Sequence, residues 1–161
     1  MNKKYLIISL LCVLIPLAGC SGASSKQKNI YTNDEQIAAQ GDTYSYLNRI
    51  GGKDSIEKTN LINLEFNRFY GTDTLWNIVS KGKHELELNY NCEISRGRFK
   101  AVLITPTKEV LVLFEGTDVG TKIINLDEGK HRLKIVGQDA KGKIRIDIPE
   151  NINIRLEKND N

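Results

Sequence analysis

Short runs in which apolar and polar residues alternate fill the chain from about Leu61 onward. Gly, Asp, Asn and Lys residues separate these runs. Alternation with a period of two between turn-forming residues is typical of antiparallel β-strands. The predicted strands are Leu61–Tyr70, Thr74–Val79, His84–Cys92, Arg98–Thr105, Glu109–Glu115, Lys122–Leu126, His131–Val136 and Lys143–Ile148.

The number of strands predicts how they pack. Ile152, Ile154 and Leu156 alternate with polar residues and predict a further edge strand. Eight or nine strands in roughly 100 residues favour two packed sheets over one open sheet, because each sheet must bury one face. We therefore predict an all-β domain over residues 59–157. It is expected to be an antiparallel two-sheet sandwich of about eight strands, with jelly-roll or immunoglobulin-like topology.

The chain before this domain lacks a strand pattern. Residues 21–33 are small and polar and predict a flexible tether. Asp34–Gln40 predicts one or two helical turns, and Gly51-Gly52 indicates a break. We therefore expect the domain to begin near residue 59 and everything before it to be dispensable for the core.

An alternative is that part of this segment covers the sandwich. The predicted strand Arg98–Thr105 is apolar on both faces, with Val102 and Ile104 on the outer one. These two side chains would then contact apolar residues of the preceding segment, namely Tyr44, Tyr46, Leu47, Ile50 and Ile56.

Residues 1–19 have the features of a secretory signal. A pair of lysines precedes an uncharged, mostly apolar run from Tyr5 to Ala18, which is shorter than the roughly 20 residues that cross a bilayer. The run ends in Leu17-Ala18-Gly19-Cys20, which resembles the lipobox of bacterial lipoproteins. The resemblance implies cleavage before Cys20 and a diacylglycerol on its thiol. It also implies that the protein is anchored on the outer side of the cytoplasmic membrane. Residues 20–58 would then comprise the lipidated amino terminus, the tether and a segment without an assigned structure.

Charge and cysteine content exclude several kinds of partner and site. Removal of residues 1–19 leaves 21 basic and 20 acidic residues, so the chain lacks the basic footprint of a nucleic-acid binder. It also lacks a local basic cluster for anionic lipids. After the signal is removed and Cys20 is lipidated, Cys92 is the one remaining thiol. A single thiol makes neither an internal disulfide nor a thiolate metal site.

Two sequence echoes divide the predicted domain. Gly82-Lys83-His84 and Gly129-Lys130-His131 each precede an alternating run, and each follows a Gly-Thr-Asp triplet, at residues 71–73 and 116–118. We predict a turn at each triplet. The echo is compatible with an internal duplication or with two similar strand corners.

The parity of the strands places the two histidines. His84 shares a face with Leu86 and Leu88, and His131 shares a face with Leu133 and Ile135. Both imidazoles are therefore predicted to cover the edge of the core and to hydrogen-bond a turn carbonyl. A metal site is the alternative and would need a third ligand, such as Asp73 or Asp118. We expect no metal and no cofactor. Cys92 lies on the same inward face and is expected to be a buried, unreactive thiol.

The predicted domain also resembles known extracytoplasmic modules. Ile124–Ile148, with Asp127-Glu128-Gly129 and Asp139-Ala140-Lys141-Gly142, resembles the closing hairpin of immunoglobulin-like and carbohydrate-binding-module-like sandwiches. Leu61–Ile148, with Gly71-Thr72 before Trp76 and the run Gly97-Arg98-Phe99-Lys100, resembles small Gram-positive lipoproteins. The resemblance implies a β-sandwich architecture.

These observations favour a non-catalytic binding or interaction module at the cell surface. A glycan- or cell-wall-binding sandwich would need exposed aromatic side chains, for which the candidates are Trp76, Tyr70, Tyr44 and Tyr46. A protein partner would instead add a strand to a free edge, for example at Asn151–Leu156. A hydrolase is less favoured, because the chain contains no catalytic motif that we can identify.

Overall fold

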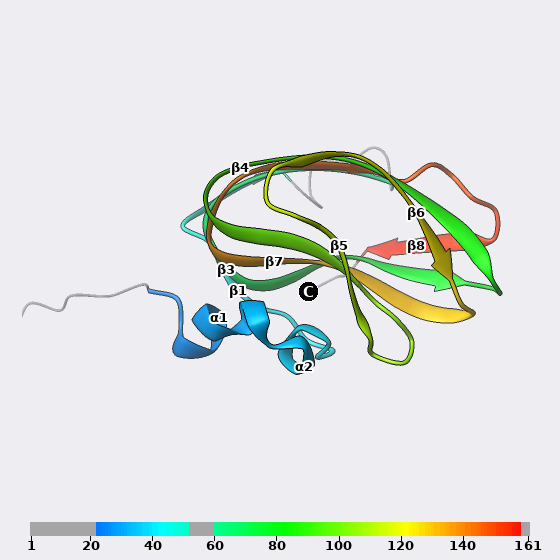
Figure 1. Cartoon of the computed structure of the whole chain (residues 1–161), viewed down its shortest axis with the longest axis horizontal. Coiled ribbons are helices and arrows are strands. Elements are labelled where there is room, and N and C mark those ends of the chain that lie inside the picture. The colour runs from blue at the N-terminus through cyan, green and yellow to red at the C-terminus, as the bar shows by residue number, and fades with distance from the viewer. Residues whose placement is uncertain (1–21, 52–59, 159–161) are drawn as a thin grey trace, which may run out of the picture.

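The computed structural model describes residues 22–51 and 60–158, which form an antiparallel sheet of eight strands folded over into two layers (Figure 1). The predicted antiparallel sandwich is confirmed. The strands are β1 (Thr43–Ser45), β2 (Asn48–Gly51), β3 (Leu61–Ser80), β4 (His84–Ile104), β5 (Val110–Glu115), β6 (Asp118–Leu126), β7 (Gly129–Asp147) and β8 (Ile154–Lys158). Strand β8 is the edge strand predicted from the last alternating residues.

Strand β7 is central and pairs with β3 on one side and β4 on the other along nearly its whole length. The first layer contains the first half of β3, the second half of β7 and the first half of β4, with β2 and β6 at its edges. The second layer contains the other halves of these three strands. It has β1 and β8 beside β3 and β5 beside β4.

The three long strands bend at one level, which turns one layer over the other. Arg68 in β3, Gly97 in β4 and Asp139 in β7 have φ angles of 51°, 74° and 52°, and the pairing register shifts beside each of them. A Cβ at Gly97 would lie 2.3 Å from the carbonyl oxygen of Asp139, so only glycine fits there. Because of this bend, six predicted short strands are the halves of three long ones.

One predicted turn is wrong. Gly71-Thr72-Asp73 lies inside β3, where a Cβ at Gly71 would lie 1.8 Å from the Thr43 carbonyl oxygen of β1. Its glycine therefore permits the close approach of β1 and does not reverse the chain. Gly116 and Thr117 do connect β5 to β6, so the two triplets are not equivalent in the fold.

The space between the layers is filled by the inward-facing residues of all three long strands. Phe66, Phe69 and Phe99 lie together near the bend, with the rings of Phe66 and Phe99 stacked at 5.0 Å. Trp76 is 1% exposed within the same cluster. Full burial of each such side chain stabilises the fold by roughly 1.5–3 kcal/mol.

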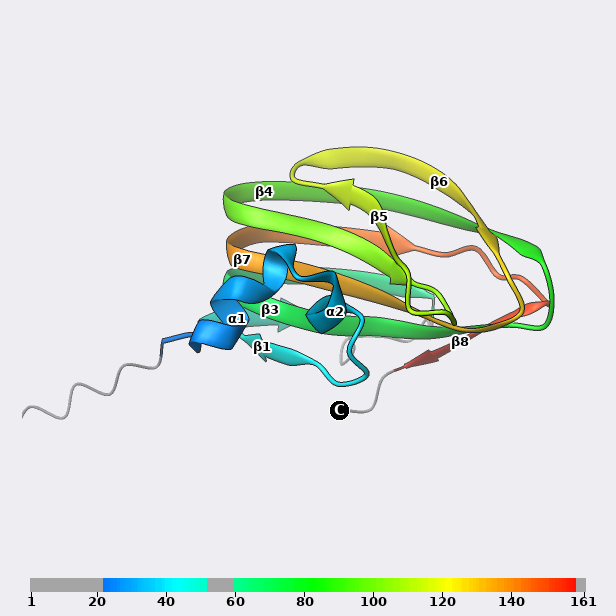
Figure 2. The same ribbon diagram turned by 60° about the horizontal axis from the view of Figure 1, so that its bottom comes forward.

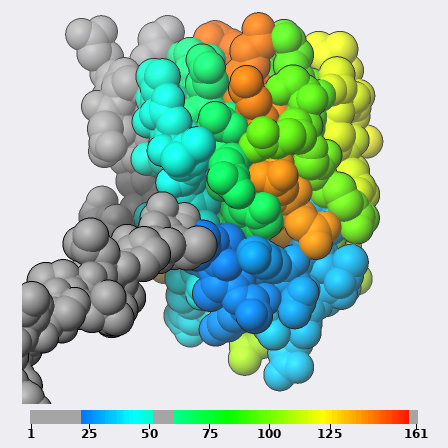
Figure 3. All heavy atoms as spheres, turned by 90° about the vertical axis from the view of Figure 1, so that its left-hand side faces the viewer, coloured from blue at the N-terminus to red at the C-terminus, as the bar shows by residue number. Residues whose placement is uncertain are grey.

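The amino-terminal residues cover the outer face of the second layer (Figures 2 and 3). Helices α1 (Ser25–Asn29), η1 (Ile30–Thr32) and α2 (Asp34–Ile37) form there, and α2 contains the predicted helical turn. The side chains of Ser24 and Asn33 accept hydrogen bonds from the first turns of α1 and α2. No helix within residues 22–51 and 60–158 is both long and apolar enough to cross a bilayer.

This covering segment differs from the tether expected over residues 21–33 and from a domain that begins at residue 59. Ile30, Tyr31 and Ile37 are buried against an outer apolar cluster that includes Val102, Ile104 and Val136. Strands β1 and β2 also pair with β3. The segment packs on the outer face of β4 because Val102 and Ile104 would otherwise be exposed to water. Residues 1–21, including Cys20, and residues 52–59, including Ile56, lie outside the described residues.

Candidate functional site

The four candidate aromatic residues do not form one platform. Trp76 is a core residue, which corrects its candidacy as a ligand-binding side chain. Tyr70 is half-buried and stands opposite Ser45 of β1. Tyr44 is 41% exposed and lies beside Tyr46, with ring centroids 5.4 Å apart. The structure thus brings together only two of the four, both at the β1 edge.

Tyr46 is part of a closed polar cluster at this edge. Its ring stacks on Phe69 at 4.6 Å, and its hydroxyl donates a hydrogen bond to Asp73 at 2.9 Å. Arg49 lies 3.7 Å from the same carboxylate, which is nearly inaccessible to solvent. Burial, and then the charge of Asp73, raises the pKa of the Tyr46 hydroxyl. This cluster joins the loop between β1 and β2 to β3 and leaves only Tyr44 open to a ligand.

The two histidines lie at neighbouring corners, where β3 turns into β4 and β6 turns into β7. His131 is buried, and its Nε2 lies 3.0 Å from the carbonyl oxygen of Asp127, so the predicted hydrogen bond to a turn carbonyl is confirmed. His84 is half-buried. Among residues 22–51 and 60–158, no group of three His, Cys, Asp or Glu side chains could hold a metal ion. That the protein is metal-free stays a prediction.

Cys92 is buried in the core, as its parity predicted. Burial, with smaller contributions from Asp118 and Glu93, raises the pKa of its thiol to about 12. A thiol that stays protonated at neutral pH is a poor nucleophile. Its position therefore gives no support to catalysis.

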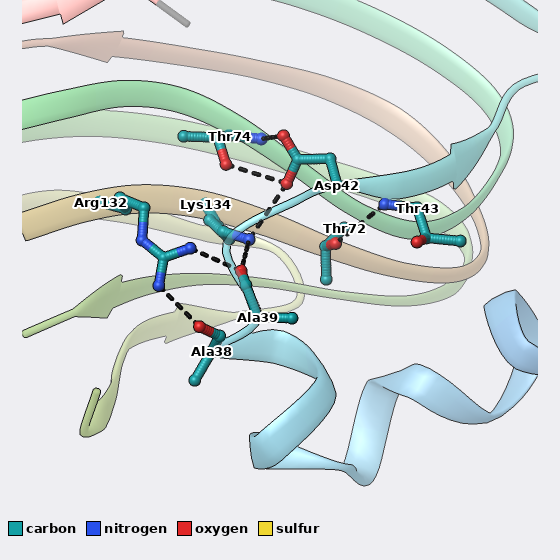
Figure 4. A network of polar contacts seen from close by, with 8 residues as sticks. All are labelled: Ala38, Ala39, Asp42, Thr43, Thr72, Thr74, Arg132 and Lys134. Atoms are coloured by element: carbon teal, nitrogen blue, oxygen red, sulfur yellow. Dashed lines mark hydrogen bonds and ion pairs between the residues drawn. The ribbon is translucent and has the colours of Figure 1, made fainter. Parts of the chain in front are cut away.

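A buried ion pair fastens the amino-terminal segment to the sheet (Figure 4). The Nζ atom of Lys134 lies 3.1 Å from Oδ1 of Asp42, and both side chains are at most 2% exposed. Asp42 also accepts hydrogen bonds from the backbone N–H and the hydroxyl of Thr74, each at 2.9 Å. Both oxygens of this carboxylate therefore have partners inside the protein.

Two main-chain carbonyls of the segment complete this network. Lys134 donates to the Ala39 oxygen at 2.8 Å, and Arg132 donates to the oxygens of Ala38 and Ala39. Burial lowers the pKa of Lys134, while Asp42 opposes that effect. We interpret this network as structural, because Lys134 and Asp42 neutralise each other in a buried position and Arg132 binds only main-chain carbonyls.

The open polar site lies on the opposite outer face, on the first layer. Two adjoining hollows of about 420 and 790 Å³ share Glu65, Glu93 and Lys143 in their lining. Two rows of side chains cross this face, each running from β3 over β7 to β4. We call these rows the outer groove; they are Glu65–Lys143–Glu93 and Asn63–Arg145–Asn91.

All six side chains of the outer groove are exposed. Lys143 lies 3.0 Å from Glu93, and Arg145 lies 3.5 Å from the amide oxygen of Asn63. Ile50, which is 57% exposed, and the partly buried Ile94 add apolar surface to the lining. The groove thus offers hydrogen-bond donors and acceptors in alternation, with a small apolar patch in each hollow.

Sequence reasoning did not find the outer groove. Its six residues come from three strands, and their proximity depends on the register of β7 between β3 and β4. The one available signal was the run of outward polar residues in each strand, which a solvated sheet face explains equally well.

Comparisons with known proteins assign no family. No family model matches the chain, and no curated protein matches it. Among solved structures, the chain is similar to an exo-β-1,3-galactanase from Phanerochaete chrysosporium, at 14% identity and a TM-score of 0.36. The aligned region covers 68% of this chain and 29% of the galactanase chain. The Drosophila melanogaster CENP-C cupin domain matches 69% of this chain and 71% of its own, at 17% identity and a TM-score of 0.28.

A third structure, procruciferin, an 11S globulin from Brassica napus, matches 94% of this chain and 36% of its own, at 12% identity and a TM-score of 0.23. Similarity at this level carries no inference about ligand or activity.

Proposed function

We propose that the protein is a non-catalytic, lipid-anchored binding module on the outer side of the cytoplasmic membrane, and that it binds an oligosaccharide in the outer groove. One observation carries this proposal. The amino-terminal helices and the outer groove occupy opposite outer faces of the sandwich.

The position of Cys20 connects the anchor to this geometry. Cys20 precedes Ser24, the residue that caps α1, by four positions, and four extended residues span about 14 Å. A lipid on Cys20 would therefore hold the helix-covered second layer close to the bilayer. The outer groove would face away from the membrane, where a cell-wall or surface glycan is accessible.

The chemistry of the outer groove suits a near-neutral ligand rich in hydroxyl groups. Each sugar hydroxyl both donates and accepts hydrogen bonds, and the groove alternates amide, carboxylate and cationic groups. Its opposite charges are balanced closely, which disfavours strongly anionic polymers such as nucleic acids. Glu65 and Glu93 are exposed beside a lysine, whereas a general acid needs a carboxyl kept protonated, usually by burial. Binding is therefore favoured over hydrolysis.

Replacing Lys143 or Asn91 by alanine is expected to weaken oligosaccharide binding about tenfold, because each change removes hydrogen bonds to the ligand. The probes are a tetramer of N-acetylglucosamine and a muropeptide, titrated into the full chain by calorimetry. Asn125→Ala is the control, since Asn125 is exposed on the same face in β6 but outside the lining of the hollows. Equal loss in the control, or no binding of either probe by the unaltered chain, would refute a glycan site here.

Replacing Cys20 by alanine is expected to abolish lipid labelling and to release the protein from the membrane fraction. Metabolic labelling with a fatty acid, followed by fractionation, measures both effects. Cys92→Ala provides the matched control, because this buried thiol is not available for acylation. Full labelling of Cys20→Ala would disprove the anchor and leave the groove to be judged by its own titration.

A further inference from the structure

We infer that the free edge of β6 pairs with β6 of a second copy of this chain and forms a two-fold symmetric dimer with one continuous first layer. The inference rests on three observations of β6, namely its open edge, its self-complementary residues and its orientation relative to the helices.

The edge of β6 is long and open. Its nine residues, Asp118–Leu126, pair with β4 on one side, and no other strand among residues 22–51 and 60–158 pairs with β6. Every side chain from Asp118 to Ile123 is exposed, and Figure 2 shows β6 at the rim of the sheet. Val119 and Ile123 are 71% and 65% exposed.

Native edge strands are usually protected from pairing by proline, a bulge or several charges. Strand β6 contains no proline, pairs with β4 without a register shift, and carries two charged residues of opposite sign, Asp118 and Lys122. Proline and bulges are therefore absent from this edge, and its two opposite charges can be matched by the same two charges of a second copy.

The outward residues of β6 match themselves in an antiparallel pair centred on Thr121. In that register Thr121 stands opposite Thr121 of the second copy, and Val119 stands opposite Ile123 of the second copy. Threonine pairs and aliphatic pairs on directly opposite positions are favourable. A slip of two residues in either direction would separate Val119 from Ile123, so this register is the one that covers both exposed aliphatic side chains.

The inward residues match in the same register. Lys122 stands opposite Gly120 of the second copy, where the missing side chain leaves room. Its two diagonal neighbours there are Asp118 and Lys122, and its ammonium is expected to turn toward the carboxylate of Asp118. A long lysine side chain reaches a diagonal position. Two-fold symmetry repeats this contact, so two Lys122–Asp118 ion pairs form across the interface. A self-complementary patch of this kind is what an isologous two-fold contact requires.

The symmetry is compatible with a shared membrane. The two-fold axis of such a strand pair is perpendicular to the sheet, so both copies present their amino-terminal helices on the same side. Both outer grooves then lie on the other side. This step alone rests on the anchor at Cys20. Tethering to one surface would also raise the local concentration, so a modest interface would suffice.

Single cysteines on β6 test the register in the full chain. Thr121→Cys places two thiols opposite each other, with Cβ atoms about 5 Å apart, and copper-phenanthroline or a short bis-maleimide should join most of the chains into dimers. Asn125→Cys is the matched control, because its two copies would lie about 27 Å apart along the strands. The unaltered chain measures any background from other cysteines.

Charge exchange tests the pairing without a cross-link. Lys122→Asp should raise the dimer dissociation constant about tenfold, measured by sedimentation of the full chain purified in detergent. Combining it with Asp118→Lys should restore most of the lost affinity. Thermal melting of each variant establishes that it folds.

Dimers of Thr121→Cys but not of Asn125→Cys, with rescue by the double charge exchange, would support the inference. A monomer at all concentrations, equal cross-linking of both cysteines, or no rescue would overturn it. A monomer that still binds the glycan probes would overturn the dimer and leave the proposed binding function intact.

Discussion

Replacing Asp42 by alanine is expected to lower the free energy of unfolding by about 3–5 kcal/mol, because the change leaves the ammonium of Lys134 buried without its counter-charge. Lys134 is fully buried, and its other hydrogen bond goes to a main-chain carbonyl of the same segment. The hydroxyl and the backbone N–H of Thr74 lose their acceptor at the same time. Denaturant unfolding followed by tryptophan fluorescence measures the loss, because Trp76 lies in the core.

Two further variants isolate the ion pair. Glu35→Ala removes an exposed carboxylate from the same segment and should change the stability by less than about 0.5 kcal/mol. The double variant Asp42→Ala and Lys134→Met removes both charges and should recover much of the lost stability. If Asp42→Ala unfolds at the same denaturant concentration as the unaltered chain, the Asp42–Lys134 ion pair does not stabilise the attachment of the amino-terminal segment to the sheet.

Deleting residues 24–38 is expected to lower the free energy of unfolding by about 5 kcal/mol or more, since the deletion removes three large buried side chains. Ile30, Tyr31 and Ile37 lie in the cluster that covers the outer face of the second layer. The loss is comparable with the whole stability of many domains, which is about 5–15 kcal/mol. The variant should therefore melt at a much lower temperature or fail to fold.

A point substitution keeps this prediction measurable if the deletion prevents folding. Ile37→Ala should cost about 2–5 kcal/mol, whereas Ile152→Ala should cost almost nothing, because Ile152 is 94% exposed. Calorimetric melting temperatures give both values. A deletion variant that melts with the unaltered chain would show that the segment is the tether expected from its composition.

The sequence predicts the strands well and their continuity poorly. Alternation within each run places the inward side chains correctly, as His131 and Cys92 show. The bends could not be predicted, because two of the three left-handed residues are Arg68 and Asp139, not glycine. These conformations are imposed by the packing of three strands that turn together, and no local pattern encodes them.

The need for a covering segment can be read from the sequence of β4, although the composition of the segment itself does not indicate it. Val102 and Ile104 lie on an otherwise polar face and required a cover, which the parity of β4 already indicated. The prediction of the covering residues was wrong, because none of Tyr44, Tyr46, Leu47 and Ile50 lies in this outer cluster. The residues that supply the cover, Ile30, Tyr31 and Ile37, are isolated apolar side chains in a polar stretch. Their importance depends on where α1 and α2 lie, and short helices of this kind have little stability of their own.

The candidate site could not be predicted from local sequence patterns either. Trp76 offered no signal beyond being the only tryptophan, since apolar residues flank it on both faces of the strand. The outer groove depends on cross-strand neighbours that are far apart in the chain, such as Glu65 and Lys143. Only the pairing register, which follows from the whole fold, brings such residues together.

The central place of β7 also determines when the chain can fold. Strands β3 and β4 follow each other in the sequence, yet neither pairs with the other, because β7 lies between them in both layers. A chain that is made or exported from its amino terminus therefore has no completed layer until Gly129–Asp147 has emerged. Such non-local pairing is slow to form. Until then the apolar faces of β3 and β4 stay open to chaperones and proteases, and the protein is committed to folding in one late step.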